Sequence, residues 1–83
     1  MNALITGGES FERIALLLSL TKITSESIRG ALTDYFVIGH SRTVAAALNG
    51  VDDKNLAKAI KRLQRIAHII EQIKQLDLGK IQG

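Results

Sequence analysis

Apolar residues recur at every third or fourth position along most of the chain, which is the spacing of amphipathic helices. Serine or threonine residues precede these stretches, where their side chains can cap a helix. The expected helices cover Phe11–Leu20, Glu26–Ile38 and Arg42–Leu48. Ser10 and Ser41 are the expected caps of the first and third helices, and Thr24 or Ser25 is the expected cap of the second.

The same spacing predicts which side chains face the core. They are Phe11, Ile14, Ala15, Leu17 and Leu18 in the first helix, Ile28, Ala31, Leu32, Tyr35 and Phe36 in the second, and Val44, Ala45 and Leu48 in the third. Gly39 is the expected end of the second helix, and Asn49-Gly50 predicts a tight turn after the third, because both residues tolerate a positive φ angle.

A fourth and longer helix is expected to begin at a cap formed by Asp52 or Asp53 and to run to about residue 78, with Gly79 as its end. Residues 1–9 are weakly patterned, and we expect them to form a loose N-terminal arm. The pattern thus predicts an all-α fold. Residues 10–83 form a small helical domain of about four helices, with a helix-turn-helix and a long C-terminal helix.

The 83 residues leave room for one domain, and the absence of cysteine excludes a disulfide or a thiolate-bound metal. The longest uncharged apolar run, Ile14–Leu20, is too short to span a membrane, and no signal peptide is apparent, so we expect a cytoplasmic protein. His40 and His68 have no sequence partner for a metal site or a catalytic pair. We expect no enzymatic activity, no cofactor and no small-molecule substrate.

The net charge of +3 is unevenly distributed. Residues 1–41 carry three lysine or arginine residues against four acidic ones, whereas residues 42–83 carry eight against four. The excess of positive charge therefore lies in the second half of the chain, where a nucleic-acid surface is then expected.

The segment from Arg42 to Leu63 has the pattern of a helix-turn-helix, with small residues in its first helix and a glycine in its turn. The start of its second helix carries cations on one face, and no acid lies among them: Lys54, Lys58, Lys61, Arg62 and Arg65. A surface helix usually alternates its charges, so a single-sign face favours phosphate binding over a merely solvated face.

Three further residues are candidate DNA contacts. Asn55 lies near the start of this helix, where it either pairs with adenine or serves as a local cap. Arg42, which opens the preceding helix, is placed to hold a phosphate or reach a minor groove, and Thr43 is a further phosphate candidate.

The long helix becomes apolar around most of its circumference beyond Arg65, and such a helix must be buried. The residues expected to serve oligomerisation are Leu63, Ile66, Ile69, Ile70, Ile73 and Leu76. Either a second copy of the chain covers this surface, or the first helix covers it alone with Leu16–Leu18.

Most of the chain, from about Ser10 to Ile70, resembles the PapB/FocB-type regulators of fimbrial adhesin biosynthesis in enteric bacteria. The resemblance is densest in Ser25–Arg42, SESIRGALTDYFVIGHSR, and is weaker in Gly50-Val51 and Lys61-Arg62-Leu63. The family usually has a cysteine where this chain has Ala46. It also has a more neutral stretch in place of Asp-Asp-Lys-Asn after Val51.

The resemblance implies a bacterial, nucleoid-associated transcription regulator that binds AT-rich double-stranded DNA upstream of fimbrial operons, often as a homodimer or higher oligomer. It also implies that Arg42 matters for DNA binding. The alternative from the residues alone is a helical protein-interaction module without direct DNA contact, in which the apolar end of the last helix docks on a partner.

Overall fold

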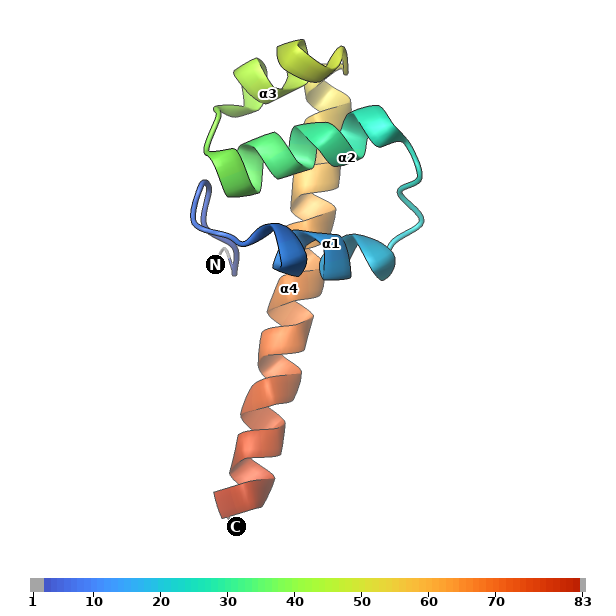
Figure 1. The fold of residues 1–83 in the computed structure, drawn as a ribbon. Helices are drawn as coiled ribbons and strands as arrows, with labels where there is room; N and C mark the ends of the chain where they lie inside the picture. Colours follow the sequence, from blue (N-terminus) through green and yellow to red (C-terminus); the bar gives the residue numbers. More distant parts are fainter. Residues whose placement is uncertain (1–2, 83) are drawn as a thin grey trace.

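The structure of the chain, a computed structural model, describes residues 3–82. Its elements in chain order are α1 (Phe11–Ser19), α2 (Glu26–Thr33), η1 (Asp34–Ile38), α3 (Arg42–Asn49) and α4 (Asp53–Gln82). The three short helices lie one above another across the N-terminal half of α4, and the rest of α4 projects away from them (Figure 1). The described residues contain no strand, and the predicted all-α fold with a long C-terminal helix is confirmed.

Serine caps begin the three short helices, as the sequence predicts. The Oγ atoms of Ser10, Ser25 and Ser41 accept hydrogen bonds from backbone N–H groups three residues later, over 3.0, 3.3 and 3.2 Å. Ser25 rather than Thr24 therefore caps α2. Each cap satisfies a backbone donor that has no partner within its own helix, which fixes where the helix starts.

The second helix is not one regular helix over residues 26–38. It ends at Thr33 and continues as the single wide π-helical turn η1, which Gly39 terminates with a φ angle of 97°. The backbone N–H groups of Gly39 and His40 both donate to the carbonyl oxygen of Asp34, at 2.9 and 3.0 Å. The wider turn leaves Phe36 fully buried, with the ring of Tyr35 packed edge-on against it.

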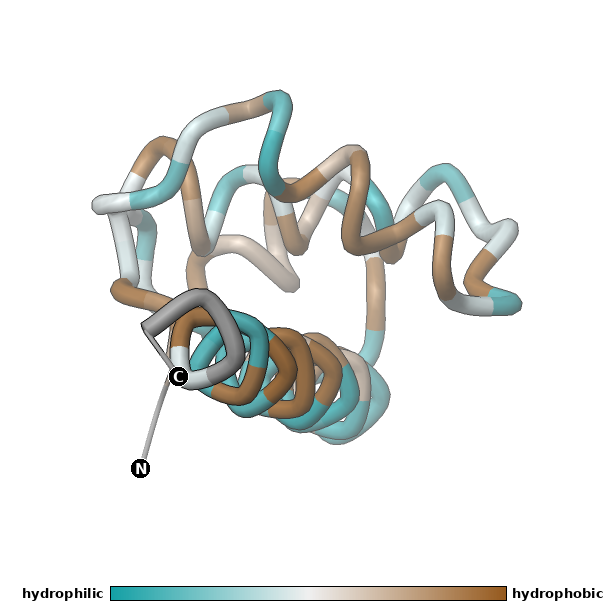
Figure 2. The backbone as a smooth tube through the Cα atoms, turned by 90° about the horizontal axis from the view of Figure 1, so that it is seen from below, coloured by the Kyte–Doolittle hydropathy of each residue, from teal (hydrophilic) through white to brown (hydrophobic). Residues whose placement is uncertain are grey.

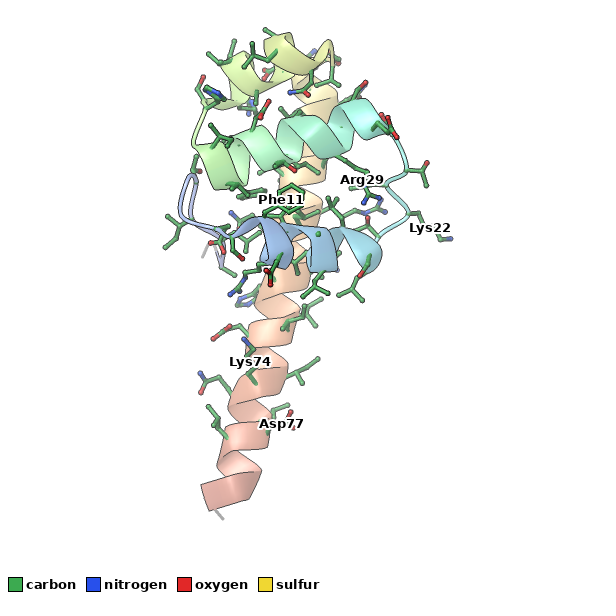
Figure 3. All side chains as sticks on the ribbon, viewed as in Figure 1. Phe11, Lys22, Arg29, Lys74 and Asp77 are labelled. Atoms are coloured by element: carbon green, nitrogen blue, oxygen red, sulfur yellow. The ribbon has the colours of Figure 1, made fainter. Side chains whose placement is uncertain are left out.

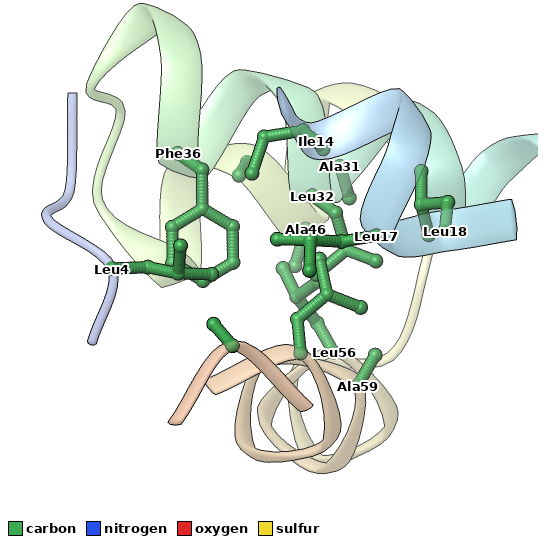
Figure 4. Close-up of a cluster of buried hydrophobic side chains, with 13 residues drawn as sticks. Leu4, Ile14, Leu17, Leu18, Ala31, Leu32, Phe36, Ala46, Leu56 and Ala59 are labelled. Carbon is green, nitrogen blue, oxygen red and sulfur yellow. The ribbon is translucent and has the colours of Figure 1, made fainter. Parts of the chain in front are cut away.

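One core joins the short helices to α4 (Figure 4). Its largest fully buried side chains are Ile14, Leu32, Phe36, Leu56 and Leu63. The helices α2 and α3 approach closely, because Gly30 has no side chain and α3 turns only Ala45 and Ala46 inward. A Cβ atom at Gly30 would lie 2.6 Å from the Oδ1 atom of Asn49.

The N-terminal segment is part of this core, so the expected loose arm is wrong for residues 3–9; residues 1–2 lie outside the described part of the chain. Leu4 is 2% exposed, and Gln64 of α4 holds its backbone through two hydrogen bonds of 2.8 and 3.0 Å. Further along, the backbone N–H groups of Gly7 and Glu9 donate to carbonyl oxygens of η1. A segment this short shows no helical period, so its packing could not be inferred from the pattern.

Four side chains expected in the core lie at the surface instead: Phe11, Ala15, Val44 and Leu48. Phe11 and Ala15 lie on a side of α1 that borders an open groove against α2. The close packing of α3 admits alanine but not the larger Val44 and Leu48. Gly79 does not end α4. A single glycine in a helix costs only about 1 kcal/mol, which does not stop a helix when no competing turn forms.

The helix α4 determines the shape of the molecule. Its 30 residues account for about 45 Å of the 49 Å length, and the other two dimensions are 23 and 21 Å. Within residues 3–82 no helix combines the length and apolar character needed to cross a membrane.

We predict that Leu4→Ala lowers the free energy of unfolding by about 2–4 kcal/mol, because it leaves a cavity beside Phe36. The neighbouring Ile5 is 69% exposed, and Ile5→Ala is expected to change stability by less than about 0.5 kcal/mol. Thermal and urea denaturation of both variants measures the difference. Equal stabilities would mean that the N-terminal segment is not part of the core.

Candidate nucleic-acid interface

The basic face of α4 consists of Lys54, Lys58, Lys61, Arg62 and Arg65. All five are exposed, while the opposite side of the same helix places Leu56, Leu63 and Ala67 fully in the core. Among the described residues, none of the five takes part in a salt bridge. The structure thus brings the predicted cations together as one positively charged surface that has no acidic partner of its own.

The turn between α3 and α4 sets the direction of this face. Gly50 ends α3 with a φ angle of 64°, and the N–H groups of Gly50 and Val51 donate to carbonyl oxygens in the last turn of α3. Leu56 then anchors the start of α4 in the core. The predicted Asn-Gly turn is confirmed, and it holds the two helices as one rigid corner.

Arg42 and Asp53 join the starts of these two helices. The Nε atom of Arg42 donates to Oδ1 of Asp53 at 2.9 Å, and an Nη atom donates to Oδ2 at 3.0 Å. This hydrogen bonding and the charge of the carboxylate raise the pKa of Arg42 above its already high ordinary value. The carboxylate of Asp53 is thus the partner of Arg42. At the start of α4, the backbone carbonyl of Asp52 accepts a hydrogen bond from the N–H group of Leu56.

Asn55, Lys58 and Arg62 line a groove beside α4 that sequence reasoning missed. Its volume is about 670 Å³, and its other wall is the loop between α1 and α2, with Lys22, Thr24 and Ser25. In the sequence this loop is only a break in the helical pattern, so the only available signal was a lysine among hydroxyl residues. The last candidate, Thr43, is exposed beside Arg42 on α3 and does not line the groove.

The candidate oligomerisation residues separate into two groups. Leu63 is fully buried in the core of the single chain, so its assignment to an interface between chains is wrong. Ile66 and Ile70 are partly buried against the core, whereas Ile69, Ile73 and Leu76 are exposed where α4 extends past the short helices. Seen along the helix, apolar and polar residues alternate around this projecting part (Figure 2).

The helix α1 contributes to the same area without covering it. Leu16 and Leu20 are largely exposed and, with Leu17, line a shallow groove of about 190 Å³ against Ala67 and Ile70 of α4. We call the combined set the apolar surface: Leu16, Leu20, Ile66, Ile69, Ile70, Ile73 and Leu76. The pattern did not assign Leu16 or Leu20 to an interface, because their exposure depends on where α1 crosses α4.

A small helical domain that carries a basic helix after a tight turn is typical of DNA-binding transcription regulators. The model of the PapB family, adhesin biosynthesis transcription regulatory protein, matches residues 1–76, and the chain belongs to this family. The resemblance noted in the sequence is therefore confirmed.

Two relatives from Escherichia coli are named as regulatory proteins of adhesin operons. The chain is 33% identical over 58 residues to the F1845 adhesin operon regulatory protein, covering 70% of this chain and 68% of the relative. It is 31% identical over 58 residues to the AFA-III adhesin operon regulatory protein, covering 70% of this chain and 57% of that relative. The crystal structure of E. coli FocB superposes with a TM-score of 0.81 at 27% identity, covering 90% of this chain and 85% of FocB.

The turn that orients the basic face gives a direct test. Gly50→Ala adds a side chain in open space, so its only cost is the positive φ angle, which we expect to lower the free energy of unfolding by about 1 kcal/mol. Gly79→Ala, the same change within α4, also meets nothing and carries no such strain, so it is not expected to lower stability. Chemical denaturation compares them; a Gly50→Ala protein as stable as Gly79→Ala would contradict the strained turn.

Proposed function

We propose that this protein is a sequence-selective DNA-binding regulator of fimbrial adhesin operons that works as a homodimer or higher oligomer in the bacterial cytoplasm, at the nucleoid. The corner of α3 and α4 acts as a helix-turn-helix, with α4 as the recognition helix. The observation that carries the proposal is the basic face of α4, five exposed cations with no acidic partner among the described residues. Membership of a transcription regulator family and the names of its adhesin operon relatives support it.

The charge arrangement favours a polyanion as the partner. Five like charges on one helix face repel one another until something negative neutralises them. A duplex supplies phosphates at close spacing and releases its condensed counterions when the lysine and arginine side chains replace them. Asn55 lies about one turn before Lys58 and about two turns before Arg62 in the same groove, at the end of the helix where recognition helices meet base edges.

Arg42 enters this interface already oriented. Asp53 occupies two of the five N–H donors of the guanidinium group, which leaves three for DNA. Both side chains are partly exposed, so the ion pair itself is weak and its main effect is to fix where Arg42 points. An arginine held in this way is suited to the narrow minor groove of AT-rich DNA, whose negative potential attracts it. Thr43, next to it, is placed for a phosphate.

Self-association is proposed to use the apolar surface. The hydrophobic effect favours covering side chains such as Ile73 and Leu76, which no part of the described chain covers. A second copy brings an identical apolar surface, and pairing two copies also pairs two recognition helices, as half-sites on DNA require.

We expect the protein to bind an AT-rich duplex more tightly than a GC-rich one, with log K falling against log salt at a slope of about −4 to −5 for about five neutralised phosphates. Arg42→Ala and Lys58→Ala are each expected to weaken binding about three- to tenfold at 0.1 M salt. Gel shifts or fluorescence anisotropy measure this. Unchanged affinity in both variants would contradict the assigned surface, and binding without salt dependence would favour the protein-interaction module instead.

The self-association interface has a matched pair of residues for its test. Ile73 and Leu78 are both 51% exposed on the projecting part of α4, but only Ile73 belongs to the apolar surface. Ile73→Asp is expected to shift the assembly toward monomer, since it places a charge in the interface. Leu78→Asp is expected to leave the assembly unchanged. Sedimentation velocity distinguishes them; the same oligomer in both variants rules out this interface.

A further inference from the structure

The groove beside α4 has two walls from distant parts of the chain. One wall is the basic side of α4, with Lys58 and Arg62 one helical turn apart. The other is the loop between α1 and α2, which contributes Lys22 and the hydroxyl groups of Thr24 and Ser25. Ile23, Ile28 and Ala59 complete the lining, and none of the described residues that line the groove is acidic.

The loop wall is anchored to the body of the domain. Thr21 Oγ1 donates to the carbonyl oxygen of Leu18 at 2.8 Å and accepts from the N–H group of Ile23 at 3.1 Å. The side chain of Ile23 packs against the core, and an Nη atom of Arg29 lies 3.5 Å from its carbonyl oxygen. Lys22, between these anchored residues, extends outward from the edge of the molecule, as Figure 3 shows. The position of its backbone is therefore set by the fold.

The chemistry of the groove fits a sugar–phosphate strand. Three cations on two walls match a ligand with several negative charges in a row, and hydroxyl groups donate to phosphate oxygens. The apolar residues between them offer a surface for deoxyribose. The groove is also open to solvent and continuous with Asn55 at the start of α4, so a long strand can enter it while α4 lies on the bases.

We propose that the α1–α2 loop is a second DNA-backbone contact, in which Lys22 and Thr24 hold one strand against Lys58 and Arg62. This inference rests on the proposed DNA binding. It adds two backbone contacts, Lys22 and Thr24, that lie outside the helix-turn-helix. Phosphate contacts of this kind fix the orientation of a recognition helix without reading sequence. The loop therefore sets how α4 lies on the duplex, and residues of α3 and α4 contact the bases that determine sequence preference.

The test compares three single variants on an AT-rich duplex over a range of salt concentrations. Lys22→Ala is expected to weaken binding about three- to tenfold at 0.1 M salt and to make the salt slope shallower by about 1, equally for AT-rich and GC-rich DNA. Lys22→Arg keeps the charge and is expected to bind like the unchanged protein. Lys80→Ala removes the same charge near the end of α4, far along the helix from this groove and beyond the residues of the apolar surface, and is expected to leave affinity and slope unchanged.

Ethylation interference locates the contact on the DNA. In the unchanged protein, ethylated phosphates on both flanks of the site block binding, and Lys22→Ala is expected to remove the block at one or two phosphates of one strand only. Thermal unfolding at the same temperature as the unchanged protein shows that the fold is intact.

Two results overturn the inference while the proposed function stands. One is normal affinity and slope for Lys22→Ala when Lys58→Ala is weakened. The other is an equal loss for Lys22→Ala and Lys80→Ala, which indicates overall charge rather than a contact. If the unchanged protein shows no salt-dependent binding to duplex DNA, the proposed function fails and the inference falls with it.

Discussion

The packing of three short helices and the N-terminal segment against one side of α4 is the contact on which the other features depend. Leu56, Leu63 and Ala67 face inward along the first half of this helix and meet α1, α2 and η1 in one core. Because that side of α4 is buried in the core, the lysine and arginine residues on the opposite side face the solvent. The position of the candidate DNA surface is thus a direct consequence of where the apolar residues of α4 are buried.

The length of α4 gives the chain two separate surfaces. The short helices cover only its first half, so the helix presents cations beside the domain and bare isoleucine and leucine side chains beyond it. One rigid element therefore carries both, and an assembly formed through the apolar surface would hold the basic faces of its subunits at a fixed spacing. The proposed DNA binding and the proposed self-association are linked in this way by the stiffness of a single helix.

The proposed interface combines side chains from three places in the chain. The helix α4 supplies the basic face, α3 supplies Arg42, which Asp53 orients, and the α1–α2 loop supplies Lys22. These contacts are positioned in different ways. Two hydrogen bonds from Asp53 orient the side chain of Arg42, whereas the anchored residues on either side of Lys22 position its backbone.

The sequence by itself determined the helices, their serine caps, the glycine turns and the charged and apolar sides of α4. These follow from interactions between residues a few positions apart, which a local pattern records. Only the tertiary structure decided the burial of Leu4, the pairing of Arg42 with Asp53, the groove beside Lys22 and the removal of Leu63 from the interface. The physical reason is the same in each case: the partners lie far apart in the chain or on different helices, and only the packing of the core brings them together.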